Sequence, residues 1–76
     1  MPYIRIQTFP KDEEIYEKFA DKVFEDLLEI WNCPPQAISI SIEEVTKDQW
    51  AEKVGKPQME PNMPNMRYYM GEKIKK

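Results

Sequence analysis

The chain has 76 residues, a net charge of −3 at pH 7, one cysteine and no histidine. A chain of this length forms one domain with a modest core, and proteins of this size often gain stability by oligomerising. The acidic balance disfavours nucleic-acid binding, which needs a basic face.

The amino-terminal segment alternates in polarity. Ile4 and Ile6 lie on one side, while Tyr3 and Arg5 lie on the other. This period of two predicts a half-buried strand over residues 2–8. Proline at position 2 suits a first strand residue, because it has no N–H to donate to a neighbouring strand.

A long helix is predicted from about residue 12 to residue 32. Pro10 ends the strand, Asp12 is placed to cap the helix, and Pro34 cannot continue it. Apolar residues recur every three to four positions, which predicts a stripe that faces the core. This stripe comprises Ile15, Phe19, Val23, Leu27 and Ile30 or Trp31.

The segment AISISIEEV predicts a second strand, with its isoleucines on one face and Ser39 and Ser41 on the other. Strand, helix and strand at this spacing form a βαβ unit with parallel strands and a right-handed crossover. The expected fold class is therefore α+β, with two parallel strands and one long helix. One helix covers only one face of the sheet, so we expect oligomerisation to complete the fold.

The carboxyl-terminal third is harder to assign. Thr46 and Gln49 have the spacing of a capping box, and Gly55 with Pro57 predicts the end of a short helix that carries Trp50. Residues 58–76 are rich in proline and methionine, and MRYYM predicts a short strand at an edge or an interface. We expect one domain over residues 1–76, with the segment from about 58 involved in the subunit interface.

The usual catalytic motifs are absent from this sequence. Two glycines leave no glycine-rich phosphate loop, and no Cys/His set is present for zinc. We therefore expect neither a cofactor nor a metal. An α-amino group, with an ordinary pKa of roughly 7.7–8.0, is a candidate base, and an apolar pocket beside a cation would lower that pKa. If Met1 is removed, Pro2 supplies such an amine.

Several features together resemble the 4-oxalocrotonate tautomerase family, whose members use an amino-terminal proline as catalytic base. These are Met1-Pro2 before an alternating strand, the long helix, ISISIEEV as the parallel strand, and Trp50 in the following turn. The stretch QWAEKVGKPQME is similar to the dimeric subgroup. The resemblance covers most of the chain.

The resemblance implies site residues position by position. Pro2 matches the catalytic proline, and Trp50 matches the pocket aromatic. Lys11 falls, with a one-residue gap, where hexameric members place a carboxylate-binding arginine. Ser39 stands where those members carry a second arginine, so Arg67 or Arg5 would have to take over that charge, although Arg5 is expected on the dimer-facing side of the sheet.

The first functional hypothesis is a tautomerase that interconverts 2-hydroxy-2-enoates and 2-keto acids. Its expected substrates are aromatic monocarboxylates such as phenylenolpyruvate, bound by Lys11, Ser39, Trp50 and Arg67. The alternative is a non-catalytic dimeric module that binds a small aromatic acid or has a structural role.

The expected partners are a small 2-keto or enol acid and a second copy of this chain, most simply in a dimer. No apolar run is long enough to span a bilayer, no secretory leader is evident, and a lone cysteine suits a reducing compartment. We therefore expect a cytoplasmic protein without membrane or nucleic-acid partners.

Overall fold

The computed structural model describes residues 1–75 and divides into two compact units, Met1–Thr46 and a second unit that begins at Lys47. The first unit contains β1 (Tyr3–Thr8), α1 (Glu13–Ile30), the 3₁₀ turn η1 (Pro35–Ala37) and β2 (Ser39–Glu44). The second contains η2 (Lys47–Gln49), η3 (Ala51–Met59), η4 (Met63–Asn65), β3 (Tyr68–Tyr69) and β4 (Glu72–Lys73). The predicted α+β class and βαβ arrangement are confirmed.

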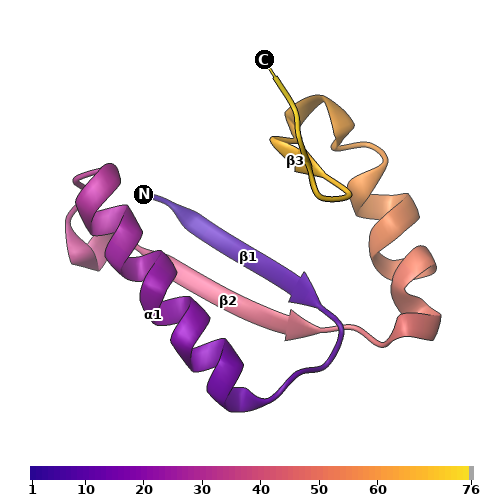
Figure 1. Cartoon of the computed structure of the whole chain (residues 1–76), viewed down its shortest axis with the longest axis horizontal. Helices are drawn as coiled ribbons and strands as arrows, with labels where there is room; N and C mark the ends of the chain where they lie inside the picture. Colours follow the sequence, from indigo (N-terminus) through magenta and orange to yellow (C-terminus); the bar gives the residue numbers. More distant parts are fainter. Residues whose placement is uncertain (76) are drawn as a thin grey trace. The chain divides into compact units, whose positions relative to one another are not determined.

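Strands β1 and β2 pair in parallel, with Tyr3 opposite Ser39 and Thr8 opposite Glu44 (Figure 1). The pairing extends one residue before the start of β1, at Pro2, and one residue past the end of β2, at Val45. The Ser39 N–H donates to the Pro2 carbonyl at 3.1 Å, and the Val45 N–H donates to the Thr8 carbonyl at 2.9 Å. Pro2 therefore takes part in the sheet through its carbonyl oxygen, which accepts a hydrogen bond. The N–H group that proline lacks is not needed for this contact.

The two faces of this sheet differ in chemistry. Isoleucines Ile6 and Ile42 line grooves together with α1 side chains, so this face lies under the helix. The opposite face carries polar side chains that pair across the strands. Tyr3 Oη and Ser41 Oγ lie 3.5 Å apart, and the Arg5 guanidinium donates to the Glu43 carboxylate.

Helix α1 begins and ends slightly inside its predicted range. Asp12 occupies the N-cap position, but its side chain makes no capping hydrogen bond, so that part of the prediction is wrong. The helix ends at Ile30 because Asn32 takes a left-handed backbone conformation, with φ of 55°. Asparagine tolerates this conformation better than most residues, which makes it a suitable helix terminator ahead of the prolines.

Tyr16 links three segments of the first unit. Its hydroxyl accepts a hydrogen bond from the Lys11 N–H at 2.7 Å and donates one to Glu44 Oε2 at 2.6 Å. The loop after β1, helix α1 and the end of β2 are thus tied together at one point. Partial desolvation, reinforced by the bond to Glu44, raises the pKa of Tyr16.

The predicted stop at Gly55 and Pro57 is wrong, because the helical segment η3 continues to Met59 with Pro57 inside it. The helix can pass Pro57 because its hydrogen bonds do not follow the α-helical pattern. Element η3 is a π-helix, and the Glu60 N–H donates to the Gly55 carbonyl five residues earlier at 3.0 Å. The Gln58 side-chain amide adds a hydrogen bond to the Lys53 carbonyl at 2.9 Å.

The predicted strand in MRYYM forms as β3, and its partner is β4 in an antiparallel hairpin. The loop consists of Met70 and Gly71, both with positive φ, at 50° and 84°. Two successive left-handed residues are the signature of a type I′ turn, in which asparagine and glycine are favoured. Methionine at the first position costs about 1–2 kcal/mol relative to an unstrained backbone.

Burial within the described chain is sparse. Leu27 and Val54 are the hydrophobic side chains that reach the buried class among residues 1–75. Along α1, large apolar side chains stay exposed instead of forming a closed core: Ile15 at 52 %, Phe19 at 51 %, Ile30 at 74 % and Trp31 at 64 %. No helix among the described residues is long and apolar enough to cross a membrane.

We predict that the folded protein is an oligomer, most simply a two-fold dimer, because burying the exposed apolar side chains requires a partner surface. Light scattering during size-exclusion chromatography at micromolar concentration should give twice the mass of the chain or a higher multiple. A cooperative, folded monomer at that concentration would contradict this expectation.

Candidate active site

Pro2 lies at the amino-terminal end of β1. Its carbonyl is held by the Ser39 N–H at 3.1 Å, and its side chain is half-buried. Met1, in contrast, is 99 % exposed. Removal of Met1 would therefore leave a secondary amine on a backbone that the sheet already positions.

Ser39 is the predicted site residue that the structure brings to Pro2. It is the first residue of β2, it is exposed, and its amide contacts the Pro2 carbonyl directly. A serine hydroxyl at this end of the sheet can donate or accept a hydrogen bond, but it cannot neutralise a carboxylate.

Lys11 lies beyond the opposite end of β1. The six residues of β1 separate it from Pro2, and at roughly 3.3 Å per residue they span about 20 Å. Within one protomer, Lys11 and Pro2 therefore cannot hold the same small substrate. Lys11 instead lines a groove of about 330 Å³ between α1 and the sheet, together with Phe19 and Ile42.

The end of the first unit that carries Pro2 also carries the carboxyl end of α1, because α1 runs antiparallel to both strands (Figure 1). A groove of about 240 Å³ lies at this end of the helix, lined by Val23, Leu27, Ile30 and Trp31 among others. Sequence reasoning assigned these side chains to the core alone. The exposure of Ile30 and Trp31 makes them a candidate apolar surface at the same end of the unit as Pro2.

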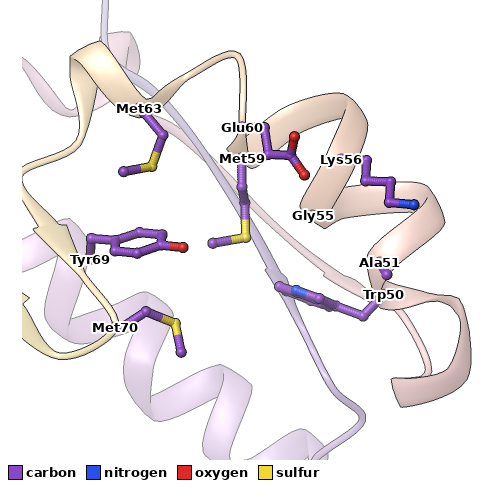
Figure 2. Close-up of a pocket in the computed structure, with 9 residues that line it drawn as sticks. All are labelled: Trp50, Ala51, Gly55, Lys56, Met59, Glu60, Met63, Tyr69 and Met70. Carbon is purple, nitrogen blue, oxygen red and sulfur yellow. The ribbon is translucent and has the colours of Figure 1, made fainter.

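Trp50 belongs to the second unit, where it lines a pocket of about 470 Å³. Figure 2 shows its ring directed toward Met59 and Tyr69. Trp50, Gly55 and Met59 lie five and four positions apart along the chain. Each of these spacings is close to one turn of a π-helix, so the three residues lie on the same face of this segment.

The cation of the Trp50 pocket is Lys56, which sequence reasoning missed. Its side chain points away from the rings of Trp50 and Tyr69 (Figure 2). Lys56 lies six positions after Trp50, a spacing that puts two side chains on different sides of an ordinary α-helix, so the helical pattern gave no signal for Lys56. Arg67, the predicted alternative, precedes β3 and is not among the pocket residues; its carbonyl accepts the Ile74 N–H at 2.8 Å.

Arg5 is engaged in an ion pair on the open sheet face. Its Nε lies 2.9 Å from Glu43 Oε2, and this hydrogen bond lowers the pKa of Glu43 and raises the pKa of Arg5. Arg5 is thus paired with an acid and is a weak candidate for substrate binding.

A comparison with protein-family models and with curated proteins found no match for this chain.

We predict a small acid-dependent contribution of the Arg5–Glu43 pair to stability. Because the folded-state pKa of Glu43 is lowered, the contribution is complete above the ordinary glutamate pKa of about 4.3 and is lost as pH falls through the lowered value. Arg5→Met should therefore destabilise the protein at pH 6 and less so at pH 3, measured by urea denaturation.

The matched control is Lys18→Met, which removes the more exposed Lys18–Glu14 pair on α1. For this control, the measured destabilisation should be close to zero at both pH values. A pH-independent effect of Arg5→Met would show that lost packing, not the charge of Glu43, causes the destabilisation.

Proposed function

We propose that this protein is a tautomerase in which Pro2, after removal of Met1, acts as general base and general acid on 2-hydroxy-2-enoates. The observation that carries the proposal is the position of Pro2. Its carbonyl is fixed by Ser39 at the end of a parallel strand, and the residue before it is fully solvent-exposed. An amine at this position is held in place and open to a substrate.

The proposed chemistry is a proton transfer between oxygen and carbon. The neutral Pro2 amine accepts the proton of the C2 hydroxyl, and the O–H electron pair forms the carbonyl. The electrons of the enol double bond then take a proton from the protonated amine at C3. The product is the 2-keto acid, the amine returns to its neutral form, and no cofactor takes part.

Such a reaction needs a neutral amine near neutral pH and a cation for the substrate carboxylate. A subunit interface that packs the exposed Ile30 and Trp31 side chains against Pro2 would favour the neutral amine by desolvation. Because Lys11 of the same protomer lies at the far end of β1, it would serve Pro2 only from a second copy. Oligomerisation is therefore part of this proposal.

The preferred substrate is proposed to be an aromatic monocarboxylate such as phenylenolpyruvate. The pocket of Trp50 and Tyr69, about 470 Å³, falls within the usual size range of small-molecule sites, roughly 300–1,000 Å³. Its aromatic and methionine side chains are of the kind that would hold a phenyl ring.

A second candidate function is supported by the same pocket. The lining of Trp50, Met59 and Tyr69 contains the groups needed to bind an aromatic acid without any base. A non-catalytic binding module would retain this affinity whether or not Met1 is removed, whereas the tautomerase requires a free Pro2 amine. Intact-mass measurement of catalytically active protein therefore separates the two, and retained Met1 would exclude Pro2 as the base.

We predict that Pro2→Ala lowers kcat/KM for phenylenolpyruvate ketonisation by at least tenfold. Alanine keeps an amino terminus on the same strand, but the amine is primary and its basicity and placement differ. In the native protein, activity should rise with pH as the amine deprotonates, with an apparent pKa below the ordinary α-amino range of about 7.7–8.0.

Both proteins must first be shown by mass to lack Met1, and circular dichroism should show the same fold for both. Identical pH–rate profiles for native protein and Pro2→Ala would show that the amine is not the base.

We predict that phenylenolpyruvate is turned over more efficiently than the dicarboxylate 2-hydroxymuconate. A dicarboxylate needs a second cation, and Ser39 cannot supply one. One lost charge-assisted contact is worth about 1.5–3 kcal/mol, which corresponds to roughly ten- to a hundredfold in kcat/KM. Ser39→Arg should narrow this gap, and Ser39→Gln is the uncharged control of similar bulk. Equal efficiencies in the native protein would contradict the prediction.

A further inference from the structure

A tyrosine side chain holds the loop between β1 and α1. Pro10 has no N–H to donate, and the N–H of the next residue, Lys11, donates to the Tyr16 hydroxyl at 2.7 Å. Tyr16 lies in the first turn of α1, which begins at Glu13. Tyr16 and Lys11 also line the same groove of about 330 Å³ beside α1. The backbone position of Lys11 therefore depends on one tyrosine hydroxyl.

A second hydrogen bond fixes the direction of the Tyr16 hydroxyl. It donates to Glu44 Oε2 at 2.6 Å, and Glu44 is the last residue of β2. A hydroxyl has one proton, so a hydroxyl that donates to the carboxylate presents its lone pairs to the Lys11 N–H. Partial desolvation, reinforced by the bond to Glu44, raises the pKa of Tyr16, so the hydroxyl keeps its proton at neutral pH.

The Lys11 ammonium has no acid partner although an acid lies close to its backbone. Among residues 1–75 two side-chain ion pairs form, and neither of them includes Lys11. Glu44 contacts the same Tyr16 oxygen as the Lys11 N–H, so its carboxylate lies near this part of the loop. Because Glu44 is engaged by a neutral hydroxyl, the charge of the lysine stays available to a ligand.

Resting on the proposed function, in which Lys11 of a second copy binds the substrate carboxylate, we propose that Tyr16 is a positioning residue for that lysine. Tyr16 acts in two ways. Its hydroxyl fixes the backbone from which the lysine side chain extends, and it engages Glu44, which would otherwise pair with the lysine ammonium. Tyr16 itself contacts no substrate.

A substrate carboxylate is bound in the ground state and in the transition state alike, so a misplaced Lys11 should raise KM and leave kcat nearly unchanged. We expect Tyr16→Phe, which keeps the ring in place beside α1, to raise KM for phenylenolpyruvate about tenfold. Damage to the Pro2 site would lower kcat instead. Tyr68→Phe is the matched control, because Tyr68 is 62 % exposed and does not line the Trp50 pocket.

Two double variants separate positioning from a general structural role. In a Lys11→Met background, Tyr16→Phe should add little to KM, because both changes act through the same ammonium. Addition of Glu44→Gln to Tyr16→Phe should lower KM again by roughly threefold, because a neutral amide cannot form an ion pair with Lys11. A general structural role would make the second double variant worse than Tyr16→Phe alone. That result, or an equal effect of Tyr16→Phe with and without Lys11, would overturn the proposal.

Binding of 3-phenylpropanoate, an unreactive monocarboxylate with a phenyl ring, tests the positioning without turnover. Its Kd, measured by calorimetry on protein that lacks Met1, should rise about tenfold in Tyr16→Phe and in Lys11→Met and stay unchanged in Tyr68→Phe. Hydrogen exchange of the Lys11 amide should also become faster in Tyr16→Phe, because its acceptor is gone.

These measurements distinguish failure of the positioning role from failure of the proposed function. Native protein that binds 3-phenylpropanoate through Lys11 and Tyr16 but does not turn over phenylenolpyruvate would contradict the tautomerase and support the role of Tyr16. Turnover that depends on Pro2, with Kd and KM unchanged in Tyr16→Phe, would overturn the positioning role alone. Absence of any binding of 3-phenylpropanoate by the native protein would overturn it as well.

Discussion

The parallel pairing of β1 with β2 is the constraint on which the rest of the first unit depends. It begins with the hydrogen bond from Ser39 to the Pro2 carbonyl and runs in register to the end of β1. Parallel pairing requires a crossover, which α1 supplies, and the helix therefore runs antiparallel to both strands. The same geometry separates Pro2 from Lys11 by the whole length of β1. The register of two strands thus decides which predicted site residues can act together.

A two-stranded sheet with one covering helix is an incomplete structure. The helix-facing isoleucines line grooves with α1 side chains, whereas the opposite face carries cross-strand pairs such as Arg5–Glu43. Exposed apolar side chains on α1 add to this unsatisfied surface. We propose that a partner subunit covers these surfaces and also contributes to the proposed site. A second copy is what would bring a Lys11 ammonium to the Pro2 end of the sheet.

The sequence predicted the first unit well because alternation with a period of two and a stripe with a period of 3.6 are direct consequences of strand and helix geometry. The sequence-based prediction failed where the backbone conformation departs from those regular periods. Asn32 ended α1 early through a left-handed conformation. The π-helix η3 continues past Pro57, and Lys56 lines the Trp50 pocket without a pattern in the sequence that indicated it. The turn at Met70 was missed because methionine is not a turn signal. Pro2 and Ser39 were predicted on the resemblance, and their proximity follows from the strand register.

Whether the Pro2 amine carries the proton can be measured directly. In protein labelled with ¹⁵N-proline and lacking Met1, the Pro2 nitrogen signal can be followed across pH beside the rate of phenylenolpyruvate ketonisation. We expect one midpoint for both curves, below the ordinary α-amino range of about 7.7–8.0. A rate that rises at a pH where the Pro2 nitrogen does not titrate, or full turnover by protein that retains Met1, would contradict the proposed mechanism.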